Sequence, residues 1–239
     1  MLCVLRNKGL IFLLLMAGAN TVTAQREMNR ADHDDWPYYF GMTLGYTSSY
    51  LHTSKSGNFI QNDSVSTVEP GKGGGIALGL MGTLKLSRRF EARANPQLII
   101  GGARTITYNL KYPLGNEKSI EKKILPSTIV SFPFQIKFNS DRIDNFRVYM
   151  LGGVRLDYDL ASNSAARNAE DLVKLKKTDY GVDVGIGFNF YLPFVTVSPE
   201  IKFCNGLSNI HSRDQSLKFS NTIDKLNSRM IVFSLHLED

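Results

Sequence analysis

Two places in the sequence carry residue types that serve nucleophilic catalysis. His52 and Ser54 lie two positions apart, and Ser119 precedes Lys122 in an S-x-x-K spacing. A histidine activates a serine only within hydrogen-bond reach and with a third group that orients its ring. His52 and Ser54 open a long polar stretch in which such residues are common, and the S-x-x-K spacing lacks its companion motifs. We therefore predict no catalytic residues and a protein that is not an enzyme.

Cofactor and metal sites are not predicted either. The stretch Gly71–Gly79 (GKGGGIALG) fits neither G-x-G-x-x-G nor the P-loop, and it leads into an alternating segment instead of a helix. Asp32-His33-Asp34-Asp35 has metal-ligand residue types, but nothing fixes its geometry, so we interpret it as a solvated linker. Lys and Arg are spread along the whole chain, which argues against nucleic acid as a partner, and no small-molecule substrate is expected.

The first 24 residues have the composition of a signal peptide. Two basic residues precede the apolar run Leu10–Ala17, and small residues offer a cleavage site between Ala24 and Gln25. Cleavage would remove both basic residues from a formal net charge of +6 and would leave Cys204 as the one cysteine, so no internal disulfide is expected. We therefore divide the chain into a signal peptide (1–24), a periplasmic lead-in (25–37) and one main domain (38–239).

Hydrophobic residues in the main domain recur with a period of two. In 180–190 the residues Tyr, Val, Val, Ile, Phe and Phe share one face, and small or polar residues share the other. Such alternation is typical of strands and excludes helices. The pattern predicts eight strands, at 38–51, 74–86, 90–110, 125–138, 146–158, 178–191, 194–205 and 228–238. Pro96, Pro133 and Pro199 interrupt three of them, and each predicts a bulge or a local bend.

The connections between these strands alternate in length. Long polar connectors span 52–73, 111–124, 159–177 and 206–227, whereas the links at 87–89, 139–145 and 192–193 are short. Barrels of the outer membrane have short periplasmic turns and longer extracellular loops. The sequence therefore predicts an all-β fold, an eight-stranded antiparallel transmembrane β-barrel of the outer-membrane type, with its N-terminus and short turns in the periplasm.

Aromatic residues gather near both ends of the predicted strands, as expected of the girdles that flank a bilayer. The girdle at the short turns is predicted to contain Tyr38, Tyr39, Phe40, Phe90, Phe138, Phe146, Tyr191 and Phe194. The girdle at the long loops is predicted to contain Tyr46, Tyr50, Tyr108, Tyr112, Tyr158, Tyr180 and Phe203.

The polar face of the strands would line the lumen of such a barrel. Its charges are close to balance, so we predict that they pair and plug the lumen instead of lining an open pore. The lumen candidates are Lys85, Glu91, Arg93, Lys137, Arg147, Arg155, Asp157, Asp179, Asp183, Glu200 and Lys202. The lysine-rich connector 111–124 could meet lipopolysaccharide or an acidic partner, or be a solvated loop.

Several motifs of the chain are shared with one known family. The sharper ones are Tyr158–Asn163 (YDLASN) with Val173–Lys177 (VKLKK), and Ile223–Arg229 (IDKLNSR). Further ones are Val68–Pro70, Phe146–Tyr149 and Gly152–Val154. Gly185–Phe188 and Ser198–Phe203 are less specific, because they are similar to segments of many unrelated small barrels. On these residues the chain resembles the PorT family, an outer-membrane component of the type IX secretion and gliding-motility system of the Bacteroidota.

The resemblance implies a barrel that is required for export of proteins with a C-terminal sorting domain, and it implies no catalytic residues. The expected partners are outer-membrane lipids and other proteins of the secretion machine. Two alternatives stay open: a general small outer-membrane barrel that serves as an adhesin or structural protein, and a lipid-modifying enzyme at the outer rim that uses His52 and Ser54. A soluble lipocalin-like barrel is a weaker alternative, because Trp36 lacks the G-x-W context of that fold.

Overall fold

The protein is described by a computed structural model that covers residues 28–55, 65–102, 104–111, 118–162, 175–212 and 223–239. These residues form one short 3-10 helix and eleven strands: η1 (Ala31–Asp34), β1 (Tyr38–Lys55), β2 (Val65–Lys85), β3 (Phe90–Ala94), β4 (Gln97–Ile100), β5 (Arg104–Leu110), β6 (Ile120–Leu125), β7 (Thr128–Asn139), β8 (Phe146–Asp159), β9 (Thr178–Tyr191), β10 (Thr196–Gly206) and β11 (Ile223–Glu238). Within these ranges no helix combines the length and the apolar composition that a membrane span requires.

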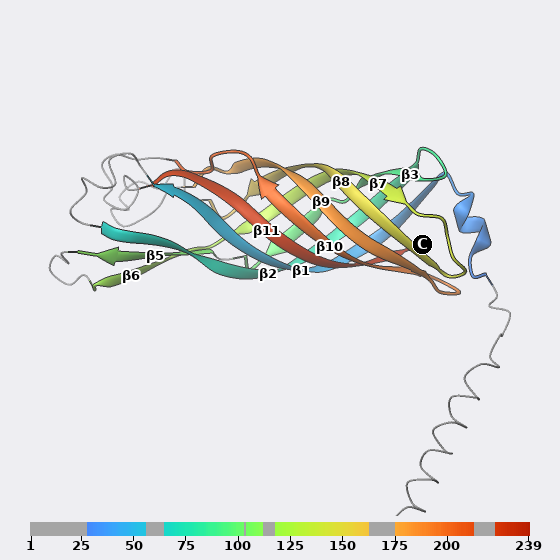
Figure 1. Cartoon of the computed structure of the whole chain (residues 1–239), viewed down its shortest axis with the longest axis horizontal. Helices are drawn as coiled ribbons and strands as arrows, with labels where there is room; N and C mark the ends of the chain where they lie inside the picture. Colours follow the sequence, from blue (N-terminus) through green and yellow to red (C-terminus); the bar gives the residue numbers. More distant parts are fainter. Residues whose placement is uncertain (1–27, 56–64, 103, 112–117, 163–174, 213–222) are drawn as a thin grey trace, which may run out of the picture.

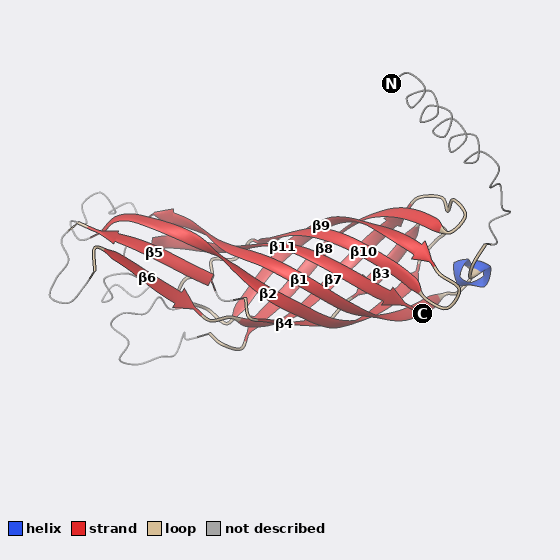
Figure 2. Cartoon of the chain, turned by 90° about the horizontal axis from the view of Figure 1, so that it is seen from below, coloured by secondary structure: helices blue, strands red, loops and turns tan. Residues whose placement is uncertain are grey.

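The strands close into a ring (Figures 1 and 2). Antiparallel pairing runs in the order β1-β11-β10-β9-β8-β7-β3-β2, and the pairing of β1 with β2 closes the circle. Strands β3 and β4 fill one position of this ring, because both pair with β2 on one side and β7 on the other. The ring therefore has eight positions, and the predicted eight-stranded antiparallel barrel is confirmed.

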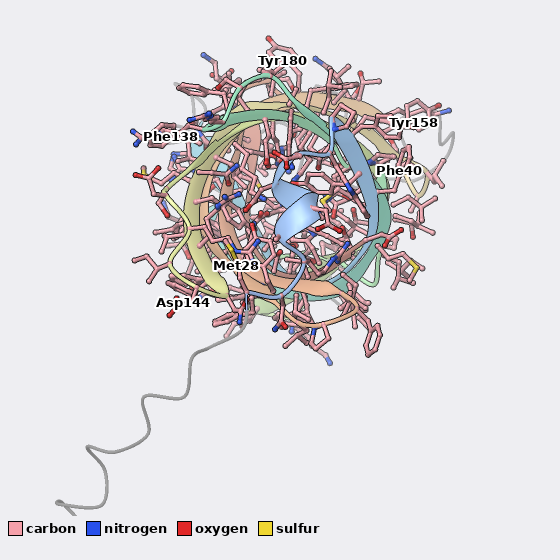
Figure 3. All side chains as sticks on the ribbon, turned by 90° about the vertical axis from the view of Figure 1, so that its right-hand side faces the viewer. Met28, Phe40, Phe138, Asp144, Tyr158 and Tyr180 are labelled. Carbon is pink, nitrogen blue, oxygen red and sulfur yellow. The ribbon has the colours of Figure 1, made fainter. Side chains whose placement is uncertain are left out.

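Side chains alternate between the two faces of the barrel wall as the period of two predicts. On β9 the outward residues Tyr180, Val184 and Phe190 are exposed, whereas Asp183 and Asn189 are buried inside. Viewed along the axis from the short-turn end, Phe40, Phe138, Tyr158 and Tyr180 point away from the ring (Figure 3). The outer face is thus a continuous apolar surface and the inner face is polar.

Three residues of the predicted girdles lie inside instead of outside. Tyr39, Tyr108 and Tyr191 are buried, with relative exposures of 3%, 0% and 1%. The prediction placed them by their height along the strands and neglected the alternation: Tyr38 and Phe40 face outward, so Tyr39 between them must face inward. Tyr112 lies outside the described residues.

The prolines do not produce the predicted bulges. Pairing of Ala94 with Phe134 and of Gln97 with Ser131 keeps one register with β7 across the break at Pro96. Likewise, Pro133 and Pro199 keep their partners in β8 and β11 without a register shift. A proline removes only its own N–H from the ladder. That loss coincides with a break between β3 and β4 at Pro96, whereas β7 and β10 continue through Pro133 and Pro199.

Several strands continue into stretches that were predicted as polar connectors. Strand β1 runs to Lys55, β2 begins at Val65, β6 occupies Ile120–Leu125, and β11 begins at Ile223, so 52–73, 111–124 and 206–227 are in part strand. At the long-loop end, β5 pairs with both β2 and β6 in a second sheet. We call this sheet, built from β5, β6 and residues 65–71 of β2, the extension (Figure 2).

The predicted strand 90–110 is one continuous partner of β2 that turns over at its middle. Ile100 and Gly101 are both exposed, while Ile99 and Arg104 are both buried, so the inward face changes from odd to even residue numbers. Gly101 has a φ of +82°, a conformation that residues with a side chain rarely adopt. This glycine allows the inward face of the strand to switch where the barrel meets the extension.

Candidate functional site

The inner wall of the barrel carries a network of buried charges in the half nearer the short turns. Glu200 on β10 is its centre, with its carboxylate 2.7 Å from Arg93 Nη1. The other carboxylate oxygen lies 3.3 Å from both Lys202 Nζ and His236 Nε2. Tyr149 donates a 2.7 Å hydrogen bond to the same carboxylate. One acid thus holds groups from four strands, which ties the ring together across its interior.

The same network reaches two further carboxylates. Arg93 Nη2 lies 3.3 Å from Glu238 Oε1, near the end of the last strand. Lys137 Nζ lies 3.5 Å from Glu91 Oε2, and Tyr39 donates a 2.8 Å hydrogen bond to that oxygen. Buried charges are costly unless they are paired, and each acid named here faces a base.

A second polar group lies farther toward the long loops. Arg155 Nη1 is 3.2 Å from Asp157 Oδ2, and Arg155 Nε is 3.5 Å from Asp183 Oδ1. Ser131 donates a 2.5 Å hydrogen bond to Asp157. A buried apolar cluster occupies neighbouring positions of the wall, and its members are Ala77, Ile99, Ile129, Cys204, Met230 and Val232. Both the polar and the apolar groups contribute to filling the barrel interior.

The N-terminal segment closes the mouth of the barrel at the short turns. Its short helix lies beyond the strand ends (Figure 1) and, viewed along the axis, in front of the centre of the ring (Figure 3). The N–H of Asn29 donates a 2.8 Å hydrogen bond to Asn145 Oδ1. Arg30 donates a 3.0 Å hydrogen bond to the carbonyl oxygen of Glu238. Asp34 lies 3.1 Å from Arg142 Nη1 and 3.0 Å from Arg147 Nη2. We call residues 29–36 the plug.

His33 is the buried centre of the plug, at 3% relative exposure. Its Nε2 lies 3.1 Å from the carbonyl oxygen of Asp239, which can only accept, so this nitrogen carries the hydrogen. Burial, with Lys85 and Arg30 nearby, lowers the pKa of His33 from 6.5 to about 4. Lys85 donates a hydrogen bond to the carbonyl oxygen of His33. The prediction of a solvated linker for Asp32-His33-Asp34-Asp35 is therefore wrong, because the barrel mouth supplies the partners that the local sequence lacks.

The long-loop end has an interior of a different kind. Ten buried apolar residues form one cluster there, contributed by the strand ends of β1, β2, β5, β6 and β11 and by two connectors. They are Leu51, Val68, Ile106, Tyr108, Leu110, Leu125, Leu175, Ile210, Ile223 and Leu226. This cluster packs the extension onto the rim of the barrel.

The structure places the predicted lumen residues in four groups along the inner wall. Glu91, Arg93, Lys137, Glu200 and Lys202 belong to the first network, and Arg155, Asp157 and Asp183 to the second. Lys85 and Arg147 are only partly buried and contact the plug. Asp179 is also partly buried and accepts hydrogen bonds from Ser208 and Ser228 near the long-loop rim. Ala24 and Gln25 lie outside the described residues.

Sequence reasoning missed several inward polar groups. His236 and Glu238 belong to the Glu200 network, and the alternation of Leu235, His236, Leu237 and Glu238 would have placed them inside. Arg104 is buried at 3% relative exposure, although its position could not be found by extending the odd-numbered pattern of β4 past Gly101.

The residues weighed for catalysis are not assembled into a site. His52 and Ser54 follow one another on the same face of β1, with His52 exposed, and no hydrogen bond between them occurs in the structure. Ser119 is exposed beside β6. Among the described residues no group of three or more His, Cys, Asp or Glu is placed to hold a metal ion.

Comparison with solved structures gives distant similarities. The surface protein NspA of Neisseria is 10% identical, with 83% of this chain and 96% of that chain covered and a TM-score of 0.42. The attachment invasion locus protein Ail of Yersinia pestis is 8% identical, with coverages of 85% and 100% and a TM-score of 0.40. The outer-membrane protease OmpT of Escherichia coli is 10% identical, with coverages of 84% and 95% and a TM-score of 0.45. At these identities and TM-scores, none of the three assigns a function to this chain.

Comparison at the level of sequence families is more informative. No curated protein is similar enough to the chain to count as a match. Residues 24–212, well over half of the chain, match the family described as the outer membrane protein beta-barrel domain. Together with the closed ring and its apolar outer face, this match shows that the chain belongs to the outer membrane protein beta-barrel domain family and resides in the outer membrane.

Proposed function

We propose that this outer-membrane barrel is a non-enzymatic component of type IX protein secretion and acts through contacts with other proteins. One observation carries the proposal: the sharper motifs shared with the PorT family, far apart in sequence, meet at the long-loop end. Leu175 of VKLKK and both Ile223 and Leu226 of IDKLNSR belong to the same buried cluster.

The YDLASN motif is tied into the same end by hydrogen bonds. The carboxylate of Asp159 accepts a 3.0 Å bond from Ser127 Oγ, a 3.3 Å bond from the N–H of Thr128 and a 2.9 Å bond from the N–H of Ala161. Ser162 donates a 2.5 Å hydrogen bond to the carbonyl oxygen of Leu175. The motif thus fixes the rim between β7 and β8 to the connector that follows, which supports a built surface at the rim.

The filled interior supports a role by contact instead of transport through the barrel. Eight strands leave room only for side chains, and here charged networks, the plug and apolar clusters occupy that room. A folded cargo cannot pass through such an interior. We propose that the short turns and the plug face the periplasm and that the extension lies outside the cell, as the loop lengths favour.

Deletion of the gene in its native bacterium tests the proposal. We expect the culture medium to lose proteins with a C-terminal sorting domain, and plasmid-borne wild-type protein to restore them. Asp159→Asn should restore them poorly, whereas Arg89→Ala, at an exposed ion pair on the opposite end, should restore them fully. Undiminished export after deletion would exclude the secretion role.

The deletion strain also separates the alternatives. A barrel that serves as an adhesin leaves export intact and reduces attachment, a possibility that the extension beyond the barrel rim keeps open. A lipid-modifying enzyme changes lipid A, and His52→Ala should then reproduce the change. We expect unaltered lipid A in both the deletion strain and the variant.

A further inference from the structure

Strand β6 is an open edge at the long-loop end of the molecule. It pairs with β5, and within the described ranges it has no hydrogen-bonded strand on its other side. Figure 2 shows it at the margin of the extension. An open edge presents unpaired backbone N–H and C=O groups, and an extended segment of another chain can complete the sheet there.

The backbone groups of alternate β6 residues are available at this edge. The N–H of Leu110 donates to the carbonyl oxygen of Ser119, which fixes which positions of the β5–β6 ladder are hydrogen-bonded. Because these positions alternate along an antiparallel pair, the backbone groups of Ile120, Lys122 and Ile124 point away from β5. The three residues with free backbone groups are also the three whose side chains face outward with Thr105, Thr107 and Asn109.

The outward side chains form a pattern of apolar, basic, apolar. Ile120 and Ile124 are 63% and 62% exposed, and Lys122 between them is exposed too. The one acid of β6, Glu121, lies on the other face, where its carboxylate accepts a 3.1 Å hydrogen bond from the N–H of Lys118. These two exposed isoleucines, beside an open backbone edge, offer apolar contacts to an added strand.

A second copy of the chain does not fit this edge. Two β6 strands paired antiparallel match their faces only when the two-fold axis passes through a residue. An axis at Glu121, Lys122 or Lys123 sets that residue directly opposite its own copy, and like charges in that position are destabilising. An axis at Ile120 sets Lys122 opposite Lys118, and an axis at Ile124 sets it opposite Pro126, which has no N–H to donate. An acidic strand partner has the opposite effect, because it meets the central lysine with an opposite charge.

We propose that β6 binds an extended protein segment that carries an acidic residue with apolar residues two positions before and two positions after it. The segment adds as an antiparallel strand, its acid opposite Lys122 and its apolar side chains opposite Ile120 and Ile124. This inference goes beyond the secretion role and does not depend on it, because the purified barrel is sufficient to test it.

The probe is the peptide fluorescein-Ser-Thr-Val-Thr-Glu-Thr-Val-Thr-Ser-amide, with the label on its N-terminal amine. It is titrated with the full-length barrel in detergent while fluorescence anisotropy is measured. We expect saturable binding that weakens with salt. A peptide with Lys in place of the Glu should bind at least about tenfold more weakly, and Lys122→Glu should reverse that order. A peptide N-methylated at alternate residues should not bind, because it cannot pair with the edge.

Two further variants separate backbone from side-chain contributions. Ile120→Pro removes an outward N–H at the first strand residue, where proline is tolerated, and should weaken binding more than Ile120→Thr, which keeps the N–H. The proposal is overturned if neither peptide binds up to about 1 mM, or if Lys122→Glu leaves the two peptides in the same order. It is also overturned if the purified barrel dimerises through β6. Binding of lipopolysaccharide vesicles through Lys122, without binding of either peptide, would overturn it as well.

Discussion

Charged side chains inside the barrel are paired so that removal of one leaves its partner buried without an opposite charge. Arg93 lies between the carboxylates of Glu200 and Glu238, and all three side chains have 0% relative exposure. Loss of one partner from a buried ion pair typically costs about 3–5 kcal/mol, whereas loss of an exposed pair costs less than about 1 kcal/mol. We therefore expect Arg93→Ala to lower the free energy of unfolding in urea far more than Arg89→Ala, which breaks the exposed pair with Asp141. Equal losses would show that the buried network adds no stability.

His33 makes the plug sensitive to acid. Its pKa is about 4 when the plug is docked and near 6.5 when it is free, because burial disfavours the charged ring. The free state thus binds more protons between these values. The contribution of His33 to docking is therefore full above pH 6.5 and falls as the pH drops toward 4, by up to about 3 kcal/mol. The ring of Trp36, the single tryptophan, lies 5.5 Å from the His33 ring at an interplanar angle of 42°, so its fluorescence reports docking. We expect quenching of the Trp36 fluorescence by acrylamide to increase as the pH falls over this range, and we expect no such increase in His33→Gln. Identical quenching curves for the wild type and the variant would contradict the role of His33.

The inward position of most of these side chains was predictable, and their partners were not. Alternation assigned Glu91, Arg93 and Glu200 to one face from sequence alone. Which acid meets which base depends on the stagger of strands that are far apart in the chain, such as Arg93 and Glu200, 107 positions apart. The burial of His33 was equally inaccessible, since its partners come from the turns and the C-terminus.

Strands and turns show where the local pattern stops being informative. The segment Ile120–Leu125 (IEKKIL) reads as a charged connector, yet it is a strand because β5 pairs with it. Strand formation depends on such neighbours more than on intrinsic preference. The barrel strands were predictable because lipid on one side and packed polar groups on the other impose alternation along their whole length.

Gly101 is the residue at which the inward face of the strand changes between the barrel and the extension. An added Cβ would have space, with its nearest contact at 3.8 Å, so the cost of a side chain comes from the φ of +82° alone. We expect Gly101→Ala to destabilise the protein by about 1 kcal/mol or more. Gly102→Ala is the matched control, because Gly102 lacks the positive φ and its Cβ would lie 3.9 Å from Ser49 Oγ. Comparison of the two by urea unfolding isolates the backbone effect, and equal losses would refute it.

The depth of an outward-facing residue in the bilayer determines how much a charge at that position destabilises the barrel. Val184 and Tyr180 both face outward on β9 with exposures of 58% and 56%, but Val184 lies deeper in the apolar belt. Arginine on the lipid face costs about 2–4 kcal/mol at the midplane and about 0–1 kcal/mol near the interface. We expect Val184→Arg to lower the free energy of unfolding from lipid vesicles by the larger amount and Tyr180→Arg by the smaller. The reverse order would mean that the centre of the membrane belt lies nearer Tyr180 than Val184.

Because its interior is filled, we expect the barrel not to conduct ions. An ion that enters at the short turns first meets the plug, held by Asp34, Arg142 and Arg147, and then the Glu200 network. Beyond these lie the wall cluster around Met230 and the apolar cluster at the long-loop end. Displacement of the plug alone therefore leaves the path blocked, because the remaining groups fill an eight-stranded barrel by themselves. We expect planar bilayers with the wild-type protein to show no large, stable conductance, and Asp34→Ala combined with Arg142→Ala to leave them silent. Steady currents in the double variant alone would identify the plug as the gate, and currents in both would show that the lumen conducts.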